Sequence, residues 1–161
     1  MQRTLPIVLS ILLFSCSARE KVIGLQQNIH HDDFEYSVQS VDKAEQIGGV
    51  RARGTFYIVA FQVENRAKRV DHQWGNDIAY LVDEAGTQHD NDAAAQQELD
   101  RTKPFGYEKQ YVTPAGATET TMLVFDLPKG VKETYLQVRG VLLMGDVFDG
   151  SQYKKTKVKL F

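Results

Sequence analysis

The segment of residues 55–64 constrains the fold of this chain more than any other, because apolar side chains occupy both faces of an extended pattern. Four of them share one face: Tyr57, Val59, Phe61 and Val63. The opposite face carries Phe56, Ile58 and Ala60. Side chains alternate between the two faces of a strand, so a strand that is apolar on both faces belongs inside a covered sheet. The segment therefore predicts a central strand of a β domain.

Six other segments have strand patterns and are separated by turn sequences. In the first, residues 34–39, the apolar Phe34, Tyr36 and Val38 alternate with polar residues. The other five are residues 78–83, 107–112, 118–127, 135–138 and 156–160. About seven short strands at this spacing predict an all-β fold, an immunoglobulin-like antiparallel β-sandwich.

Residues 92–101 interrupt the β pattern. Three alanines are followed by glutamine, glutamate and leucine, which favour a helix, and Asn91 or Asp92 is suited to cap its N-terminus. Its apolar face is small. We therefore expect one short helical insertion that serves as a connector between strands.

The N-terminus has the pattern of a bacterial lipoprotein signal. An apolar run of about ten residues follows Arg3 and ends in the lipobox sequence Leu13-Phe14-Ser15-Cys16. A membrane-spanning helix needs roughly 20 apolar residues, so a transmembrane anchor is not expected. Cleavage before Cys16 would free its amino group and thiol for acyl chains. The alternative is an ordinary secretory signal that is cleaved after Ser15 without lipidation.

These features divide the chain into three parts: a signal peptide at residues 1–15, a lipidated tether at residues 16–30 and a single β-sandwich domain at residues 31–161. Cys16 is the only cysteine, so its acylation would leave no thiol for a disulfide, a metal site or catalysis. We expect the protein in the bacterial cell envelope, in contact with the membrane through its lipid. Since Ser17 and not an aspartate follows Cys16, the outer membrane is expected in a host with two membranes.

The charge pattern argues against nucleic-acid binding. The chain has 19 basic and 21 acidic residues, and nucleic-acid recognition needs a concentrated basic surface. The densest basic group, Lys154, Lys155, Lys157 and Lys159, straddles a predicted strand. We expect these lysines to solvate or protect the edge of a sheet, and a site for a polyanion or a lipid headgroup is the alternative.

Several runs resemble a known family. They are GTFYIVAFQVEN at residues 54–65, LVDEAG at residues 81–86, and VTPAG at residues 112–116 leading into LVFDLP at residues 123–128. They resemble an uncharacterised bacterial family of extracellular lipoproteins with an immunoglobulin-like domain, related in fold to a secreted mycobacterial immunogenic protein. The resemblance covers residues 34–160 and implies a sandwich at the cell surface or in the periplasm. It implies no activity, and the helical insertion departs from the family pattern.

Two groups of histidines and aspartates are candidate metal ligands. The candidates are His30, His31 and Asp32 in one group, and His89, Asp90 and Asp92 in the other. Neither group has a recognised ligand spacing, and adjacent residues of a strand point to opposite faces. Solvated loops are the alternative interpretation, and a better metal site would require the two groups to meet.

Calcium is a further hypothesis, because carboxylates gather at Asp83, Glu84, Asp90 and Asp92. The spacing of an EF-hand loop is missing. Asp146 and Asp149 add two carboxylates, but their Gly-rich surroundings indicate first of all a turn. No resident cofactor is expected beyond such an ion.

Motifs of catalysis are not found in the sequence. It contains no G-x-S-x-G motif and no phosphate-binding glycine loop. Paired carboxylates of the kind that cleave glycosides cannot be judged without their separation. We therefore expect a protein that is not an enzyme and keep an envelope hydrolase as a third hypothesis.

Three aromatic residues are candidates for partner binding: Trp74, Phe105 and Tyr107. Trp74 lies in a polar stretch between strong strands, and an aromatic residue on a loop often anchors a partner. Alternatively, Trp74 closes one end of the sandwich core. The leading functional hypothesis is a lipid-anchored, non-catalytic binding or accessory protein that contacts another envelope protein. The alternative is a surface lipoprotein that binds a metal or a small ligand through the histidine and aspartate loops.

Overall fold

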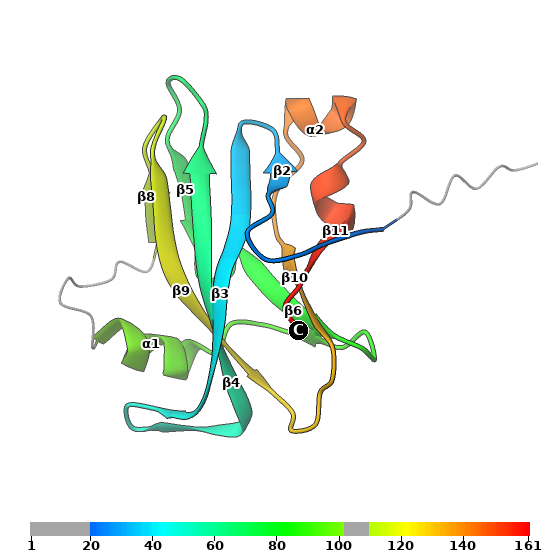
Figure 1. Cartoon of the computed structure of the whole chain (residues 1–161). Helices are drawn as coiled ribbons and strands as arrows, with labels where there is room; N and C mark the ends of the chain where they lie inside the picture. The colour runs from blue at the N-terminus through cyan, green and yellow to red at the C-terminus, as the bar shows by residue number, and fades with distance from the viewer. Residues whose placement is uncertain (1–19, 102–109) are drawn as a thin grey trace, which may run out of the picture.

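The computed structural model describes residues 20–101 and 110–161 of the 161-residue chain. Two sheets pack face to face (Figure 1). The five-stranded sheet has the order β1 (Lys21–Ile23), β11 (Thr156–Lys159), β10 (Thr134–Val138), β6 (Ala79–Asp83) and β7 (Gln88–His89). The four-stranded sheet has the order β2 (Ile29–His31), β3 (Phe34–Ile47), β4 (Val50–Asn65) and β9 (Thr118–Leu127). Strands β5 (His72–Gly75) and β8 (Gln110–Thr113) form a separate antiparallel ribbon. The predicted β-sandwich is confirmed.

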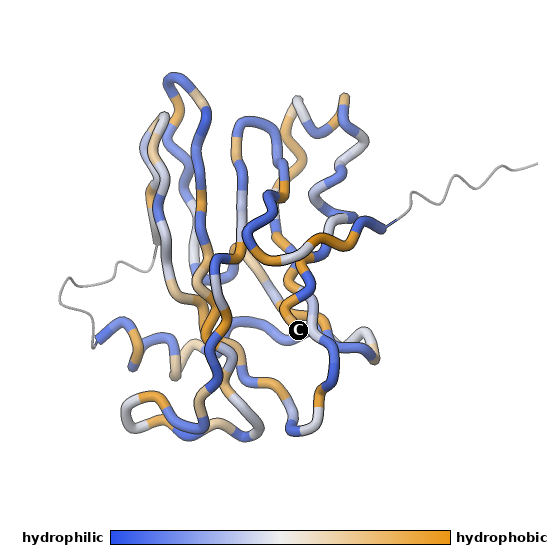
Figure 2. Tube along the Cα trace, in the orientation of Figure 1, coloured by the Kyte–Doolittle hydropathy of each residue, from blue (hydrophilic) through white to orange (hydrophobic). Residues whose placement is uncertain are grey.

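Strand β4 is central, as its sequence predicts. It pairs with β3 on one side and β9 on the other. One face of β4 lies in the main core, where Val59 and Phe61 are fully buried together with Leu81 and Leu136 of the opposite sheet. Figure 2 shows hydrophobic residues recurring along the strands that meet there. The alternation of apolar side chains thus places the core between the two sheets.

The other face of β4 is covered by the helix α1 (Ala93–Arg101). Phe56 of β4 and Val124 of β9 are fully buried with Ala95 of the helix in a second, smaller core. Asp92 caps the helix, since its Oδ1 accepts a hydrogen bond from the backbone nitrogen of Ala95 at 3.0 Å. The predicted helix and its cap are therefore confirmed.

The helix is more than a connector, which corrects the expectation from its sequence. Gln96 is 2% exposed and binds the backbone of β9. Its Oε1 accepts from the nitrogen of Val124 at 2.9 Å, and its Nε2 donates to the oxygen of Met122 at 2.8 Å. A side-chain amide thus takes the place of a neighbouring strand at the edge of the sheet.

Strand β4 approaches the end of β9 closely at Gly54. A Cβ atom built there would lie 1.9 Å from the carbonyl oxygen of Leu127. The backbone nitrogen of Gly54 donates to Asp126 Oδ1 at 3.0 Å. Only a residue without a side chain fits this approach.

The predicted tether at residues 16–30 is wrong over its second half. Lys21–Ile23 pairs in parallel with β11, and Ile29 is 1% exposed. The ordered domain therefore begins before residue 31. Short strands without a sustained alternation are poorly marked in a sequence, because their pairing depends on distant segments.

Further elements lie in segments that the sequence indicated as loops. The polar stretch after β4 contains β5, and residues 144–155 form the short helix α2 (Met144–Phe148) and the 3₁₀ turn η1 (Gln152–Lys155). Strand β11 lies between β1 and β10, so the lysines near it do not protect an edge as expected. No helix among residues 20–101 and 110–161 is long and apolar enough to span a membrane.

Candidate functional site

A cleft of about 500 Å³ opens where β2, β3 and β5 meet the segment that follows β10. We call it the aromatic cleft, and its lining includes Phe34, Tyr36, His72, Trp74, Arg139 and Gly140. Ring faces thus surround a small number of polar groups. This size and this composition are typical of sites for small organic ligands.

A continuous row of buried polar side chains leads from α2 to the cleft. We call it the histidine network, and it consists of Asp146, His31, Tyr36 and His72. His31 Nε2 lies 3.1 Å from Asp146 Oδ2, and His31 Nδ1 lies 3.1 Å from the Tyr36 hydroxyl. The same hydroxyl lies 2.8 Å from His72 Nε2. Asp146 is fully buried, so the network extends from the interior to the cleft wall.

Two proton arrangements satisfy these contacts. In one, His31 donates from both ring nitrogens as an imidazolium, and the Tyr36 hydroxyl donates to His72 Nε2. In the other, the Tyr36 hydroxyl donates to His31 Nδ1 and accepts from His72 Nε2, and His31 is neutral. The first arrangement holds one proton more than the second, and the tautomer of His72 differs between them, whereas the heavy atoms occupy the same positions in both.

The end of the network that faces the cleft is uncharged at neutral pH. Burial raises the pKa of the Tyr36 hydroxyl far above its ordinary value, and the charge of Asp146 adds to the effect. Burial and the neighbouring His31 lower the pKa of His72 to about 4. Tyr36 and His72 therefore present neutral hydrogen-bonding groups beside the ring faces.

Segment 140–146 fits tightly against β2. A Cβ at Gly140 would lie 2.5 Å from His31 Cε1, and a Cβ at Gly145 would lie 2.3 Å from Asp32 Oδ1. Asp146 Oδ2 also accepts from the backbone nitrogen of Leu143 at 2.8 Å. The two glycines leave room for the side chains of His31 and Asp32, and the Asp146 carboxylate binds both His31 and Leu143. These contacts hold this wall of the cleft in place.

Stacked rings form the remaining walls. The ring centroids of Phe34 and His72 are 3.8 Å apart, with 16° between the planes. Beneath them, the ring of Tyr153 stacks on His31 at 4.0 Å, and its hydroxyl donates to the oxygen of Gly140 at 2.9 Å. The walls are thus fixed by neighbours on several elements.

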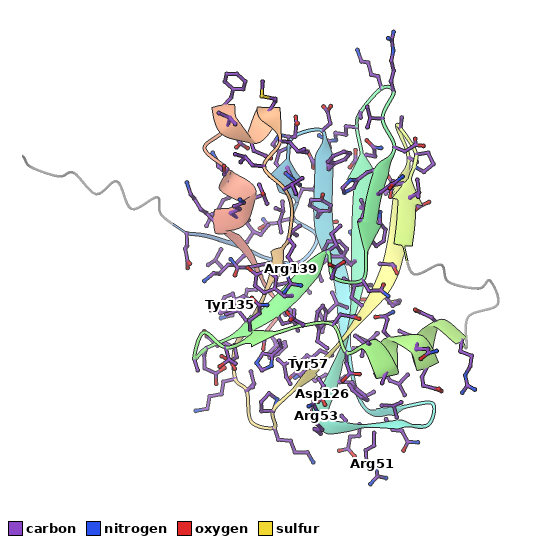
Figure 3. All side chains as sticks on the ribbon, turned by 180° about the vertical axis from the view of Figure 1, so that it is seen from behind. Arg51, Arg53, Tyr57, Asp126, Tyr135 and Arg139 are labelled. Atoms are coloured by element: carbon purple, nitrogen blue, oxygen red, sulfur yellow. The ribbon has the colours of Figure 1, made fainter. Side chains whose placement is uncertain are left out.

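Arg139 supplies a cation at the rim, next to β10 (Figure 3). Its Nη2 lies 2.5 Å from Asp90 Oδ1, and its Nη1 donates to the backbone oxygen of Asp77 at 3.2 Å. The hydrogen bond from Arg139 lowers the pKa of Asp90, assisted by one from Gln88. The rim is therefore held by an ion pair between β10 and the chain that follows β7.

The first group of predicted metal ligands is dispersed. His30 is largely exposed, and its Nδ1 lies 3.6 Å from Glu35 Oε1. His31 points into the interior, and Asp32 lies in the turn after β2 with a φ of 53°. These three side chains do not converge on one point.

The second group lines a polar hollow of about 360 Å³ without forming a ligand set. His89 binds Asp83 at 2.9 Å, and this hydrogen bond lowers the pKa of Asp83. Asp90 binds Arg139, and Asp92 caps α1. Arg53 and Asp126, which are adjacent in Figure 3, also line this hollow. The Nε atom of Arg53 lies 3.2 Å from the Oδ2 atom of Asp126.

Metal binding by the combined groups therefore finds no support in this arrangement. Of the first group only His31 lines the aromatic cleft, whereas the second group lines the polar hollow. Within the described ranges no three or more histidine, cysteine, aspartate or glutamate side chains are placed to hold a metal ion.

Of the predicted partner-binding aromatics, Trp74 is buried. It lies on β5, is 5% exposed and belongs to the main core, and its indole nitrogen donates to Thr113 Oγ1 at 2.9 Å. Trp74 is therefore a core residue and not an exposed loop side chain, and it also lines the aromatic cleft. Phe105, Tyr107 and Cys16 lie outside the described residues.

The fold is similar to that of several solved bacterial proteins. The yjhA protein from Bacillus subtilis is 13% identical, with a TM-score of 0.59 over 88% of this chain and 99% of that chain. The secreted protein MPT63 from Mycobacterium tuberculosis is 14% identical, with a TM-score of 0.55 over 77% and 92%. An uncharacterised β-sandwich protein from Clostridium difficile is 13% identical, with a TM-score of 0.54 over 89% and 95%.

These likenesses show the fold alone, since every identity is low. They confirm the expected relationship in fold to a secreted mycobacterial protein. No protein-family model matches the sequence, and no curated protein matches it either.

Proposed function

We propose that the protein is a lipid-anchored, non-catalytic binding protein of the bacterial cell envelope, and that the aromatic cleft receives a small organic ligand. The observation that carries the proposal is the pairing of stacked ring walls with the neutral Tyr36 and His72 in a cleft of about 500 Å³. A flat ligand with one hydrogen-bonding substituent matches such a lining.

The contacts of His31 favour binding over catalysis. Its two ring nitrogens lie 3.1 Å from Tyr36 and Asp146, so both are engaged by protein groups. A general base needs a nitrogen within reach of the substrate proton. Tyr36 contacts only the Nε2 atom of His72, so a ligand in the cleft can be positioned by His72 Nδ1 and the ring faces without a general base.

Anchoring through Cys16 rests on the lipobox sequence. A location in the envelope agrees with the neighbour in fold that is described as secreted. The mass of the N-terminal peptide from purified membranes tests this part, because acylation of Cys16 adds the mass of the acyl chains. The contact with another envelope protein that the sequence predicts is part of the same proposal.

Thermal melts with phenol, indole and benzoate as probes test the cleft. A ligand that binds only the folded state raises the melting midpoint. We expect a rise for the unaltered protein that His72→Ala abolishes and that the control His30→Ala, at an exposed position of β2, retains. Equal responses of the two variants, or no response of the unaltered protein to any probe, would contradict binding of this ligand class in the cleft. Parallel melts with calcium, zinc and copper test the metal hypothesis.

A further inference from the structure

An apolar surface lies on and beside α2, next to the aromatic cleft, whose lining it shares only at Val141. We call it the apolar ridge, and it consists of Val141, Leu142, Met144, Val147 and Phe148. Phe148 is 87% exposed and Met144 is 78% exposed. Single exposed apolar residues are ordinary, but five within eight consecutive positions mark a contact surface.

The segment that carries the apolar ridge is fixed to the rest of the domain. Asp146, in the middle of α2, points inward and binds His31 at 3.1 Å. Gly140 and Gly145 fit against His31 and Asp32 without room for a side chain. The exposed side chains therefore stand on a helix whose buried face is held by the histidine network. A surface that is held in this way loses little conformational freedom when it binds.

The N-terminal end of the described chain lies beside the segment that follows α2. Glu20 and Lys21 line one hollow with Asp149 and Gly150, and Glu20 lies 2.8 Å from the Nζ of Lys157. In Figure 1, β1 and α2 lie on the same side of the molecule. Cys16 precedes Glu20 by four residues, a length of about 14 Å when fully extended. Acyl chains on Cys16 would hold this side of the domain close to the bilayer.

Lysines accompany the ridge. Lys154 and Lys155 belong to η1 directly after α2, and Lys21 begins β1. Apolar side chains that are followed by cations are typical of surfaces that lie in the interface of anionic membranes. The tether length and these charges together indicate a lipid surface as the occupant.

We propose that the apolar ridge inserts into the interface of an anionic lipid bilayer and forms a second membrane contact beside the acyl chains of Cys16. The orientation rests on the proposed lipid anchor, whereas the affinity of the ridge for lipid does not. The acyl chains of Cys16 already attach the chain, and the ridge adds a contact made by the domain itself. It also orients the domain, with α2 toward the lipid.

A polarity-sensitive dye at the ridge tests insertion. The full chain, purified from bacterial membranes, carries Val147→Cys labelled with nitrobenzoxadiazole and is mixed with vesicles of phosphatidylethanolamine and phosphatidylglycerol. Some acyl chains of these vesicles carry nitroxide quenchers. Val70→Cys is the matched control, because Val70 is 61% exposed and Val147 is 58% exposed. Val70 lies in the connection between β4 and β5.

We expect the emission of the dye at residue 147 to shift to the blue and to be quenched several-fold by the nitroxides, while the dye at residue 70 stays in water. Phe148→Asp in the Val147→Cys protein reduces quenching several-fold, because the lost apolar burial is worth about tenfold or more in partition. An aqueous signal at residue 147 with vesicles present would overturn the proposal. Shielding that depends on protein concentration without vesicles would also overturn it, in favour of a second copy of the chain.

The mass of the N-terminal peptide from the same preparation distinguishes a failure of the ridge proposal from a failure of the proposed lipid anchor. An unmodified Cys16 would also take up the dye, so the signal of residue 147 is then read in a protein that carries Cys16→Ser together with Val147→Cys. A quenched dye in that protein would contradict the anchor and support the ridge. An acylated Cys16 together with an aqueous dye would support the anchor and contradict the ridge.

Discussion

The Nε2 atom of His31 lies 3.1 Å from the Oδ2 atom of Asp146, and neither side chain is more than 3% exposed. His31 ends β2, and Asp146 lies within α2, so the contact joins the start of the four-stranded sheet to a helix near the C-terminus. It supports the wall of the aromatic cleft and the base of the apolar ridge together.

Removal of Asp146 should therefore destabilise the fold strongly. Its loss leaves the buried His31 Nε2 and the backbone nitrogen of Leu143 without the carboxylate that contacts both, which costs about 3 kcal/mol. We expect Asp146→Ala to lower the free energy of unfolding by about this amount in urea titrations. Asp149→Ala, a neighbouring half-buried carboxylate, should cost about 1 kcal/mol or less. Additive effects of His31→Leu and Asp146→Ala in a double-mutant cycle would contradict the coupling.

Acidification should destabilise the protein through His72. Its pKa is about 4 in the folded state, below the ordinary 6.5, so folding favours the neutral ring. The stability that the neutral His72 ring contributes to the fold is fully present above pH 6.5 and is lost as the pH falls toward about 4. Phe34 and Tyr36, which contact the ring, and the neighbouring His31 remain in a His72→Gln variant. Urea midpoints of this variant should fall less between these pH values, and parallel pH profiles would refute the assignment.

Replacement of Gly54 should be far more costly than replacement of Gly49. The Cβ of Gly54→Ala would collide with the Leu127 carbonyl at 1.9 Å, whereas Gly49 has no neighbour within 4 Å of its Cβ position. We expect a loss of about 2 kcal/mol for Gly54→Ala and no loss beyond about 0.5 kcal/mol for Gly49→Ala. Thermal melts of the two variants measure the difference, and similar midpoints would show that β4 and β9 shift apart freely.

Gln96 should protect the edge of β9. Gln96→Ala removes partners from the backbone nitrogen of Val124 and the oxygen of Met122, which costs about 1–3 kcal/mol. It also opens the edge to pairing with another chain. We expect lower stability in urea and faster aggregation by light scattering. Gln97→Ala, at the exposed neighbouring position, should behave like the unaltered protein.

Trp74, the only tryptophan of the chain, should emit as a buried indole. Acrylamide should quench its fluorescence weakly in the folded protein and strongly in urea. Efficient quenching in both states would contradict its place in the core.

The parts of the fold that sequence reasoning predicted are those that local pattern determines. The strand over residues 55–64 and the helix capped by Asp92 carry their periodicity and cap in neighbouring residues. Strands β1 and β2 have three residues each, too few for an alternation to be visible. Their place depends on β11 and β3, which no local pattern reveals.

The candidate site was largely missed for a related reason. Tyr36 has the position of a core aromatic on a strand, and Asp146 has the surroundings of a turn carboxylate. The sequence indicates His31 as a candidate metal ligand beside His30 and Asp32. The partners of His31 come instead from β3 and α2, so the three side chains do not form one group. The glycines at 140 and 145, which precede Asp146, were the available signal of a close approach.

The parallel pairing of β1 with β11 has a mechanical consequence. A pull on the chain ahead of Glu20 acts along β1, so the hydrogen bonds of Lys21–Ile23 are loaded in shear and must yield together. The pair of Glu20 with Lys157 lies at the point where the force enters. A domain tethered at this end would resist drag on its anchor better than one whose first strand could be peeled away bond by bond.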